Sequence, residues 1–279
     1  MSPGGGTQAF APRLGLLSSA LPGAAAGAVC DAASAVHLEG VEWAFGPAEV
    51  LRPDDAERVA PELLRSAAER GLRVCGLAAQ AATLLCHDGR EAGRAVELAA
   101  TLGAPHLRVF APPYTGGDVT SELAALRSTL AAVAARARAA GVRLLVELSP
   151  RTLLPGPAWF LLVADGLDDA SVGVVYDPGS MLMEGHVHPA LTVAALGDRL
   201  GHVHVKDVAP RREPPGWRWG HVPLGEGMVP WSEVTQALAG AGYAGWLVVD
   251  HLGGEPTAAQ LRADVAALRD LLDSSDGKG

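Results

Sequence analysis

Eight short apolar segments recur along this 279-residue chain, and most are followed by an Ala-rich helical pattern. Strands that are apolar on both faces are typical of a parallel sheet covered by helices. Eight such units in a chain of this length predict a closed (β/α)8 barrel, the TIM barrel, in a single domain. An open doubly wound sheet is the alternative, but no G-x-G-x-x-G pattern follows the first segment. The expected strands are 13–19, 35–43, 72–78, 106–112, 142–148, 172–177, 200–207 and 244–250.

The segments between these strands predict the rest of the architecture. Pro at a first turn and Gly after a last turn mark several helix ends, such as Gly71, Gly103 and Gly141. A long loop is expected over 209–229, between the seventh strand and the next helix. We place the barrel domain at 12–273, between a flexible arm at 1–11 and a flexible tail at 274–279. The expected helices are 53–70, 90–102, 121–140, 157–165, 188–198, 231–239 and 257–272, and a weak helical segment follows the first strand.

Composition excludes several classes of partner. The 31 acidic and 22 basic residues give a net charge of −9, which disfavours a nucleic-acid groove. No apolar run reaches the roughly 18 residues of a membrane span. The three cysteines have no metal-ligand spacing, and the N-terminus lacks the pattern of a signal peptide. We therefore expect a cytoplasmic protein with reduced thiols that binds neither nucleic acid nor membrane.

Four successive strand-like segments end in an acid or a histidine: Glu147, Asp177, His204 and Asp250. In a parallel barrel the C-terminal strand ends meet at one face, so these side chains are expected to converge. Oxygen and imidazole ligands that converge in this way suit a divalent metal. The sequence therefore predicts a metal site at this face of the barrel.

Each of these residues also has an ordinary structural interpretation. Glu147 would form a buried ion pair with an arginine such as Arg151, and Asp177, which precedes Pro178-Gly179, would be a turn residue. Asp250 would cap the loop that follows it.

The histidines and the lysine near the seventh strand have competing interpretations too. Lys206 either holds a substrate oxygen or forms an ion pair with Asp207 or His202. His221 is expected to be a solvated loop residue, and His251 is expected to point to the other side of its strand from Asp250.

Residues 141–252 resemble the xylose isomerase-like TIM-barrel family of sugar-phosphate isomerases and epimerases. The likeness rests on VGVVYDPGS, LGDRLGHVHVKD, VPLGEGMVPW and GYAGWLVVD, and it is weaker in the N-terminal half, where VELAATLGAPHLRVF fits by its pattern. The resemblance implies a divalent metal (Mn, Mg, Co or Zn) on ligands that fall on Glu147, Asp177, His204 and Asp250. It also implies proton transfer by Glu147 and Asp250, with Lys206 beside them.

The chain departs from the family at four residues. Asp250 stands where the family has Glu, which sets the carboxylate back by about 1.5 Å. Ser149-Pro150 stand where the family commonly has Asn-His or a similar polar pair, and Ser180 stands where His or Asn is common. These changes indicate an intact metal set with altered substrate recognition.

The function that follows from the resemblance is a metal-dependent isomerase or epimerase, or a dehydratase-type lyase, acting on a polyhydroxylated carbonyl compound. A diverged barrel with altered chemistry or a non-catalytic binding role is the main alternative, and an endonuclease IV-type phosphodiesterase is disfavoured because its additional histidines are missing. A homo-oligomer is possible. The candidate substrate contacts are Glu42, His87, Tyr114, Ser180, Trp217 and Trp219.

Overall fold

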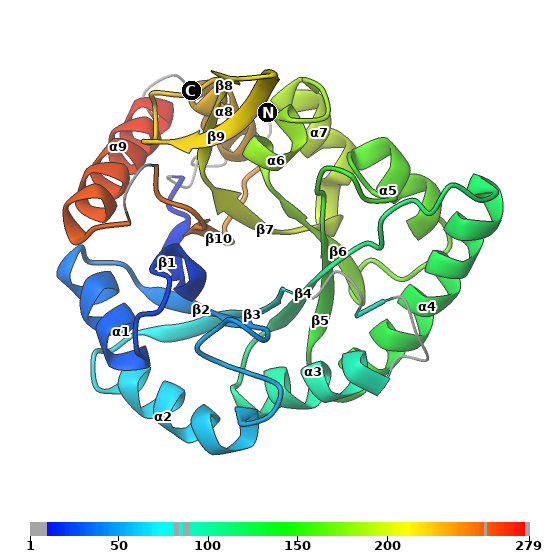
Figure 1. Ribbon diagram of the computed structural model, residues 1–279, viewed down its shortest axis with the longest axis horizontal. Coiled ribbons are helices and arrows are strands. Elements are labelled where there is room, and N and C mark those ends of the chain that lie inside the picture. Colours follow the sequence, from blue (N-terminus) through cyan, green and yellow to red (C-terminus); the bar gives the residue numbers. More distant parts are fainter. Residues whose placement is uncertain (1–9, 81–83, 86–89, 254–255, 277–279) are drawn as a thin grey trace, which may run out of the picture.

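Eight parallel strands close into a barrel, and helices form a ring around it (Figure 1). The computed structural model describes residues 10–80, 84–85, 90–253 and 256–276. The strands follow the order β1-β10-β7-β6-β5-β4-β3-β2, and β1 closes the ring by pairing with both β2 and β10. The predicted (β/α)8 barrel is thereby confirmed.

The barrel strands are short and almost wholly buried, as their continuous apolar character requires. Their bounds are Arg13–Leu17 (β1), Gly40–Phe45 (β2), Arg73–Ala79 (β3), His106–Phe110 (β4), Arg143–Glu147 (β5), Val172–Tyr176 (β6), Leu200–Val205 (β7) and Trp246–Val249 (β10).

The helices pack their apolar sides on these strands. Their bounds are Ala26–Ala35 (α1), Ala56–Ala68 (α2), Arg90–Thr101 (α3), Val119–Ala139 (α4), Pro157–Ala164 (α5), Pro178–Leu182 (α6), Pro189–Leu196 (α7), Trp231–Gly240 (α8) and Ala258–Asp276 (α9). None of the helices in the described residues combines the length and apolar character that a membrane span requires. Most of the predicted helices are found within a few residues of their expected bounds, and α9 continues through residues 274–276, which were expected to belong to the tail.

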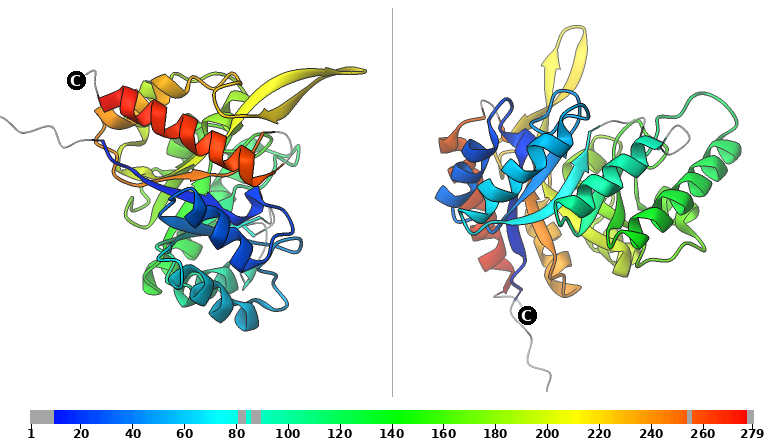
Figure 2. Two further views of the ribbon diagram at one scale, coloured as in Figure 1. Left: turned by 90° about the vertical axis from the view of Figure 1, so that its left-hand side faces the viewer. Right: turned by 90° about the horizontal axis from the view of Figure 1, so that it is seen from below.

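Two expectations are corrected. The second strand begins at Gly40 rather than at residue 35, because α1 extends to Ala35 and the chain then turns through His37, whose φ is 54°. The segment expected as a long loop instead forms an antiparallel hairpin of β8 (Asp207–Glu213) and β9 (Gly216–Val222). Its turn lies at Pro214-Pro215, and Figure 2 shows it projecting from the barrel. Its polar and Pro-rich residues resemble a loop because most of them are solvent-exposed, so no apolar pattern marks the two strands.

Candidate metal and catalytic site

The four predicted ligands lie at the C-terminal ends of neighbouring strands. Glu147 is the last residue of β5, Asp177 follows β6, His204 is the penultimate residue of β7, and Asp250 follows β10. All four are buried. One donor atom from each of Glu147, Asp177 and His204 lies within 4.8 Å of the other two. The fold therefore brings three of the predicted ligands together in a geometry that could hold a metal ion.

Lys206 joins the fourth carboxylate to this group. Its Nζ lies 2.6 Å from Asp177 Oδ2 and 2.9 Å from Asp250 Oδ2. Burial alone would lower the pKa of Lys206, but Asp177 and Asp250 outweigh burial and raise it. The lysine therefore carries its charge between two buried carboxylates. The ion pair with Asp207 or His202, one of the two interpretations considered from the sequence, does not form.

Asp207 is hydrogen-bonded to backbone N–H groups and not to Lys206. Its carboxylate accepts hydrogen bonds from the backbone N–H groups of Gly225 (3.0 Å), Gly227 (3.2 Å) and Val229 (3.1 Å). A Cβ on Gly227 would lie 2.0 Å from Asp207 Oδ1, so only glycine permits this approach. The LGEG segment is thus folded around Asp207 beside the site.

Arg108 is the counter-ion of Glu147. Arg108 Nε lies 3.2 Å from Glu147 Oε2, and Arg108 Nη1 donates to the carbonyl of Ala79 at 2.9 Å. Both charged side chains are buried. Burial raises the pKa of Glu147, but Arg108 and His204 overcome this and hold it below its ordinary value. The ion pair that was considered with Arg151 forms with Arg108 instead.

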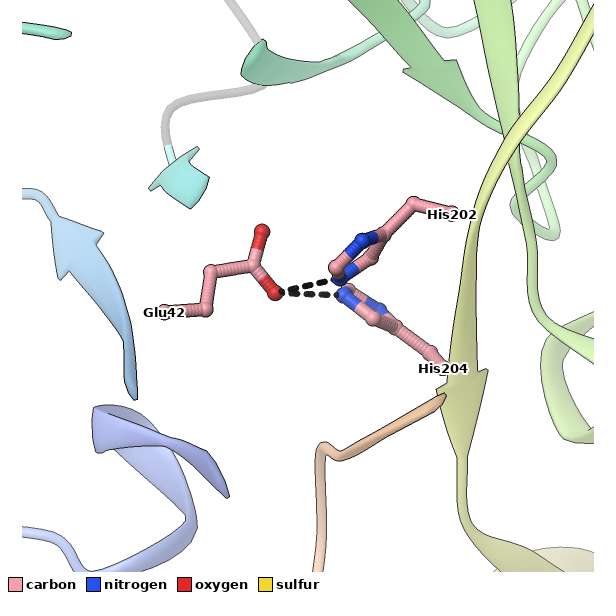
Figure 3. Close-up of side chains that lie close together, drawn as sticks. All are labelled: Glu42, His202 and His204. Atoms are coloured by element: carbon pink, nitrogen blue, oxygen red, sulfur yellow. Dashed lines mark hydrogen bonds and ion pairs between the residues drawn. The ribbon is translucent and has the colours of Figure 1, made fainter. Parts of the chain in front are cut away.

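Glu42 supports the histidines of β7 across the barrel interior. Figure 3 shows its carboxylate pointing from β2 at His202 and His204. Glu42 Oε2 lies 3.2 Å from His202 Nε2 and 2.9 Å from His204 Nε2. These three residues form a second group whose donor atoms could hold a metal, and all are fully buried. Glu42 thus lies in the interior, against the expectation that it would contact substrate from the strand end.

The two ring nitrogens of His204 face different carboxylates. Nε2 faces Glu42, whereas Nδ1 lies 3.5 Å from Glu147 Oε2. Burial lowers the pKa of His204, but Glu42 and Asp250 more than compensate and raise it to about 10. For His202 burial prevails and lowers the pKa to about 4. His202 and His204, two positions apart in the same strand, therefore differ in charge at neutral pH.

His251 also belongs to the site, contrary to the expectation that it would point away. Its Nδ1 lies 2.8 Å from Asp250 Oδ2, and its ring packs on that of His221 with the centroids 4.2 Å apart. Asp250 is the first residue after the end of β10, so strand alternation no longer applies to it and its neighbour. Lys206 and His251 together hold the pKa of Asp250 well below its ordinary value despite its burial.

The remaining candidate substrate contacts are placed as follows. Ser180 is buried and donates through its backbone N–H and its hydroxyl to Asp177, which caps α6. Tyr114 is exposed in the loop after β4, and its hydroxyl donates to the carbonyl of Gly117. Trp217 and Trp219 are exposed on β9. His87 lies outside the described residues.

The donor set fits a divalent metal. Glu147, Asp177 and His204 supply two oxygens and one imidazole nitrogen, and His204 Nδ1 is buried without a hydrogen bond among the described residues. Asp250 reaches this group through Lys206. A histidine must be neutral to bind a metal, so His204 would release its proton on binding, and Lys206 would leave Asp177.

The sequence comparison decides the family. The family described as xylose isomerase-like TIM barrel matches residues 30–271. The chain belongs to this family. Curated protein sequences give no match.

Solved structures of xylose isomerase-like barrels share the whole architecture. L-ribulose 3-epimerase is 19% identical, with a TM-score of 0.75 and coverage of 96% of this chain and 97% of that chain. A probable 3-DHS dehydratase from Bacillus anthracis is 17% identical, with a TM-score of 0.73 and coverage of 92% and 98%. A xylose isomerase-like TIM barrel protein from Mycobacterium smegmatis in complex with magnesium is 16% identical, with a TM-score of 0.68 and coverage of 95% and 97%. At these identities the likeness shows the fold alone.

Proposed function

We propose that the protein is a metal-dependent isomerase or epimerase, or a dehydratase-type lyase, for a polyhydroxylated carbonyl compound such as a sugar or a keto acid. The observation that carries this proposal is the convergence of Glu147, Asp177 and His204 at the strand ends. Structural relatives include an L-ribulose 3-epimerase and a probable dehydratase, which supports the same reaction classes here. The two cysteines that the structure describes, Cys30 and Cys75, are free and buried, in keeping with a cytoplasmic protein.

Glu147, Asp177, His204 and Asp250 would hold the metal. When bound, a divalent ion supplies Lewis acidity that polarises a carbonyl and makes the adjacent C–H more acidic. The magnesium complex of the M. smegmatis barrel supports a metal of this kind, while its identity stays open.

Glu147 and Asp250 are the proposed proton carriers. The strands β6 and β7 separate β5 from β10, so these carboxylates would approach a substrate from different sides. Arg108 holds Glu147 in its ionised form, the form in which a carboxylate can accept a proton. Asp250 shares its Oδ2 with Lys206 and His251, and this hydrogen-bonded group would return or accept the second proton.

Lys206 would hold a substrate oxygen once it is released from Asp177. A barrel that works without metal is the competing function, because the buried carboxylates already have cationic partners within the protein. Arg108, Lys206 and His204 already face the carboxylates of Glu147, Asp177 and Asp250. In that case the lysine ammonium would itself stabilise negative charge on a substrate.

Metal content separates these two functions. The purified protein and Asp177→Asn, which keeps the helix-capping oxygen but loses the charge, are analysed by elemental mass spectrometry after incubation with Mn, Co or Zn. We expect about one ion per chain in the wild type and none in the variant. Exchange of carbon-bound hydrogen from D2O into candidate ketoses and keto acids, followed by NMR, then tests the chemistry. A wild type that holds no ion would contradict the metal-dependent function.

A further inference from the structure

The hairpin of β8 and β9 has no third strand on either side among the described residues. Two-stranded sheets are at best marginally stable alone in water, and open strand edges favour contact with another chain. This hairpin nevertheless projects well beyond the barrel in both views of Figure 2. Packing against another protein surface would stabilise such a hairpin.

One face of the hairpin is aromatic. Trp217 pairs with Arg212 and Trp219 pairs with Pro210 across the ladder, and directly opposed residues lie on the same face. Trp217 is 70% exposed and Trp219 is 38% exposed. Two indoles side by side on a projecting ribbon are a large apolar surface, and such surfaces mark interaction sites.

The end of the hairpin is basic, whereas the remainder of the chain is acidic. Arg211, Arg212 and Arg218 against Glu213 give residues 211–218 a net charge of +2. The whole chain has a net charge of −9, so the residues outside 211–218 have a net charge of −11. Charge complementarity selects an acidic partner for the hairpin, and a nucleic acid or an anionic membrane would be repelled by the rest of the molecule.

A second uncovered apolar surface lies on α5 and α7, which pack against each other. The sequence of α5, PAWFLLVA, is apolar all round, which is typical of a helix covered on both sides. Its Trp159 and Leu162 are 43% and 57% exposed, and Leu191 of α7 is 63% exposed. Asp165 adds an exposed acid directly after α5.

We propose that two copies of this chain form a symmetric dimer in which the Trp217–Trp219 face of each hairpin packs on the α5–α7 surface of the other copy. A second copy offers both the apolar patch and the acidic charge that the hairpin needs. Hairpin-to-hairpin pairing would instead bring like charges together. Two-fold symmetry forms the contact twice, so both exposed surfaces of each copy are covered. The inference is independent of the proposed function.

Sedimentation velocity on the full chain tests the dimer. We expect the wild type to be dimeric at about 100 μM chain. Trp217→Ser and Leu162→Ser should each weaken the dimer by about tenfold or more, since they remove apolar anchors. Leu64→Ser is the matched control, because Leu64 is an exposed leucine of α2, outside both surfaces, and should leave the dimer unchanged. All three replaced residues are solvent-exposed, and circular dichroism checks that each variant is folded.

Cross-linking tests which surfaces meet. A Trp217→Cys, Leu162→Cys double variant should form a disulfide-linked dimer on mild oxidation, and neither single variant should. A monomeric wild type would overturn the proposal, as would a dimer that both serine variants leave intact. If the wild type stays monomeric but binds to a heparin column or to an oligosaccharide, the hairpin serves another partner and the dimer proposal is overturned.

Discussion

Lys206 Nζ lies 2.6 Å from Asp177 Oδ2, on a carboxylate that the proposed metal site requires. The same ammonium contacts Asp250 at 2.9 Å and is buried. A divalent ion and this lysine cannot both neutralise Asp177 at close range, because two cations would then lie next to each other in a region of low dielectric. Metal binding and the Lys206–Asp177 ion pair therefore compete.

Lys206→Met should raise the affinity for Mn2+ by about tenfold or more, because the competing ammonium is gone. Isothermal titration calorimetry measures this change. The metal-free variant should lose about 3–5 kcal/mol of stability, since the buried carboxylates of Asp177 and Asp250 lose the ammonium group that lies between them. Added Mn2+ should restore much of that loss. Lys206→Arg, which keeps the charge, is the control, and an unchanged affinity in Lys206→Met would contradict the competition.

Glu42→Gln should weaken metal binding by about 10–100-fold, the usual effect of losing a carboxylate that orients a ligating histidine. Glu42 holds His204 Nε2 at 2.9 Å, which leaves Nδ1 directed at Glu147. The glutamine is nearly isosteric, so circular dichroism should show an intact fold. Calorimetric titration with Mn2+ is the readout, and wild-type affinity in this variant would remove Glu42 from the site.

Arg108→Met should destabilise the protein by about 3–5 kcal/mol, because it leaves the buried Glu147 carboxylate without its cation. Urea denaturation at neutral pH measures the free energy of unfolding. Arg65→Met is the comparison: its ion pair with Glu69 on α2 is exposed, so the change there should stay within about 1 kcal/mol. Equal effects in the two variants would show that burial of the Arg108 pair is unimportant.

Three buried or half-buried histidines together should contribute most to the free energy of unfolding near pH 6.5. Burial lowers the pKa of His202 and His221 from 6.5 to about 4, so the unfolded chain binds more protons between these values and stability falls as the pH drops from 6.5 to 4. The pKa of His204 is raised to about 10, so its contribution is complete below pH 6.5 and is lost as the pH rises toward 10.

Urea denaturation of the metal-free protein across pH 4–10 measures this profile. His221→Gln should make the acid limb less steep, whereas the exposed His186→Gln should leave it unchanged. An acid limb in His221→Gln as steep as that of the wild type would contradict the role assigned to His221.

Much of the architecture could be read from local patterns. Continuous apolar runs predicted the eight barrel strands, and Gly141 marked the end of α4 with the positive φ of 75° that glycine favours. The convergence of Glu147, Asp177 and His204 followed from their shared position at strand ends. These features are predictable because parallel strands and their crossovers leave one topology and one functional face.

The partners within the site depended on the tertiary structure. Arg108 lies in the middle of β4, where an arginine gives no sign of its partner, and it reaches Glu147 because β4 and β5 are neighbours. Glu42 meets His202 and His204 only when the barrel closes, because closure leaves just β1 and β10 between β2 and β7. Lys206 forms ion pairs with Asp177 and Asp250 and not with the adjacent Asp207. The carboxylate of Asp207 instead accepts hydrogen bonds from backbone N–H groups of residues 225–229.

The sequence thus determined which residues would gather at one end of the barrel, because strand period and topology are local properties of the chain. The three-dimensional structure decided which charges are paired, since ion pairing in a buried site depends on distances across the barrel between residues far apart in sequence.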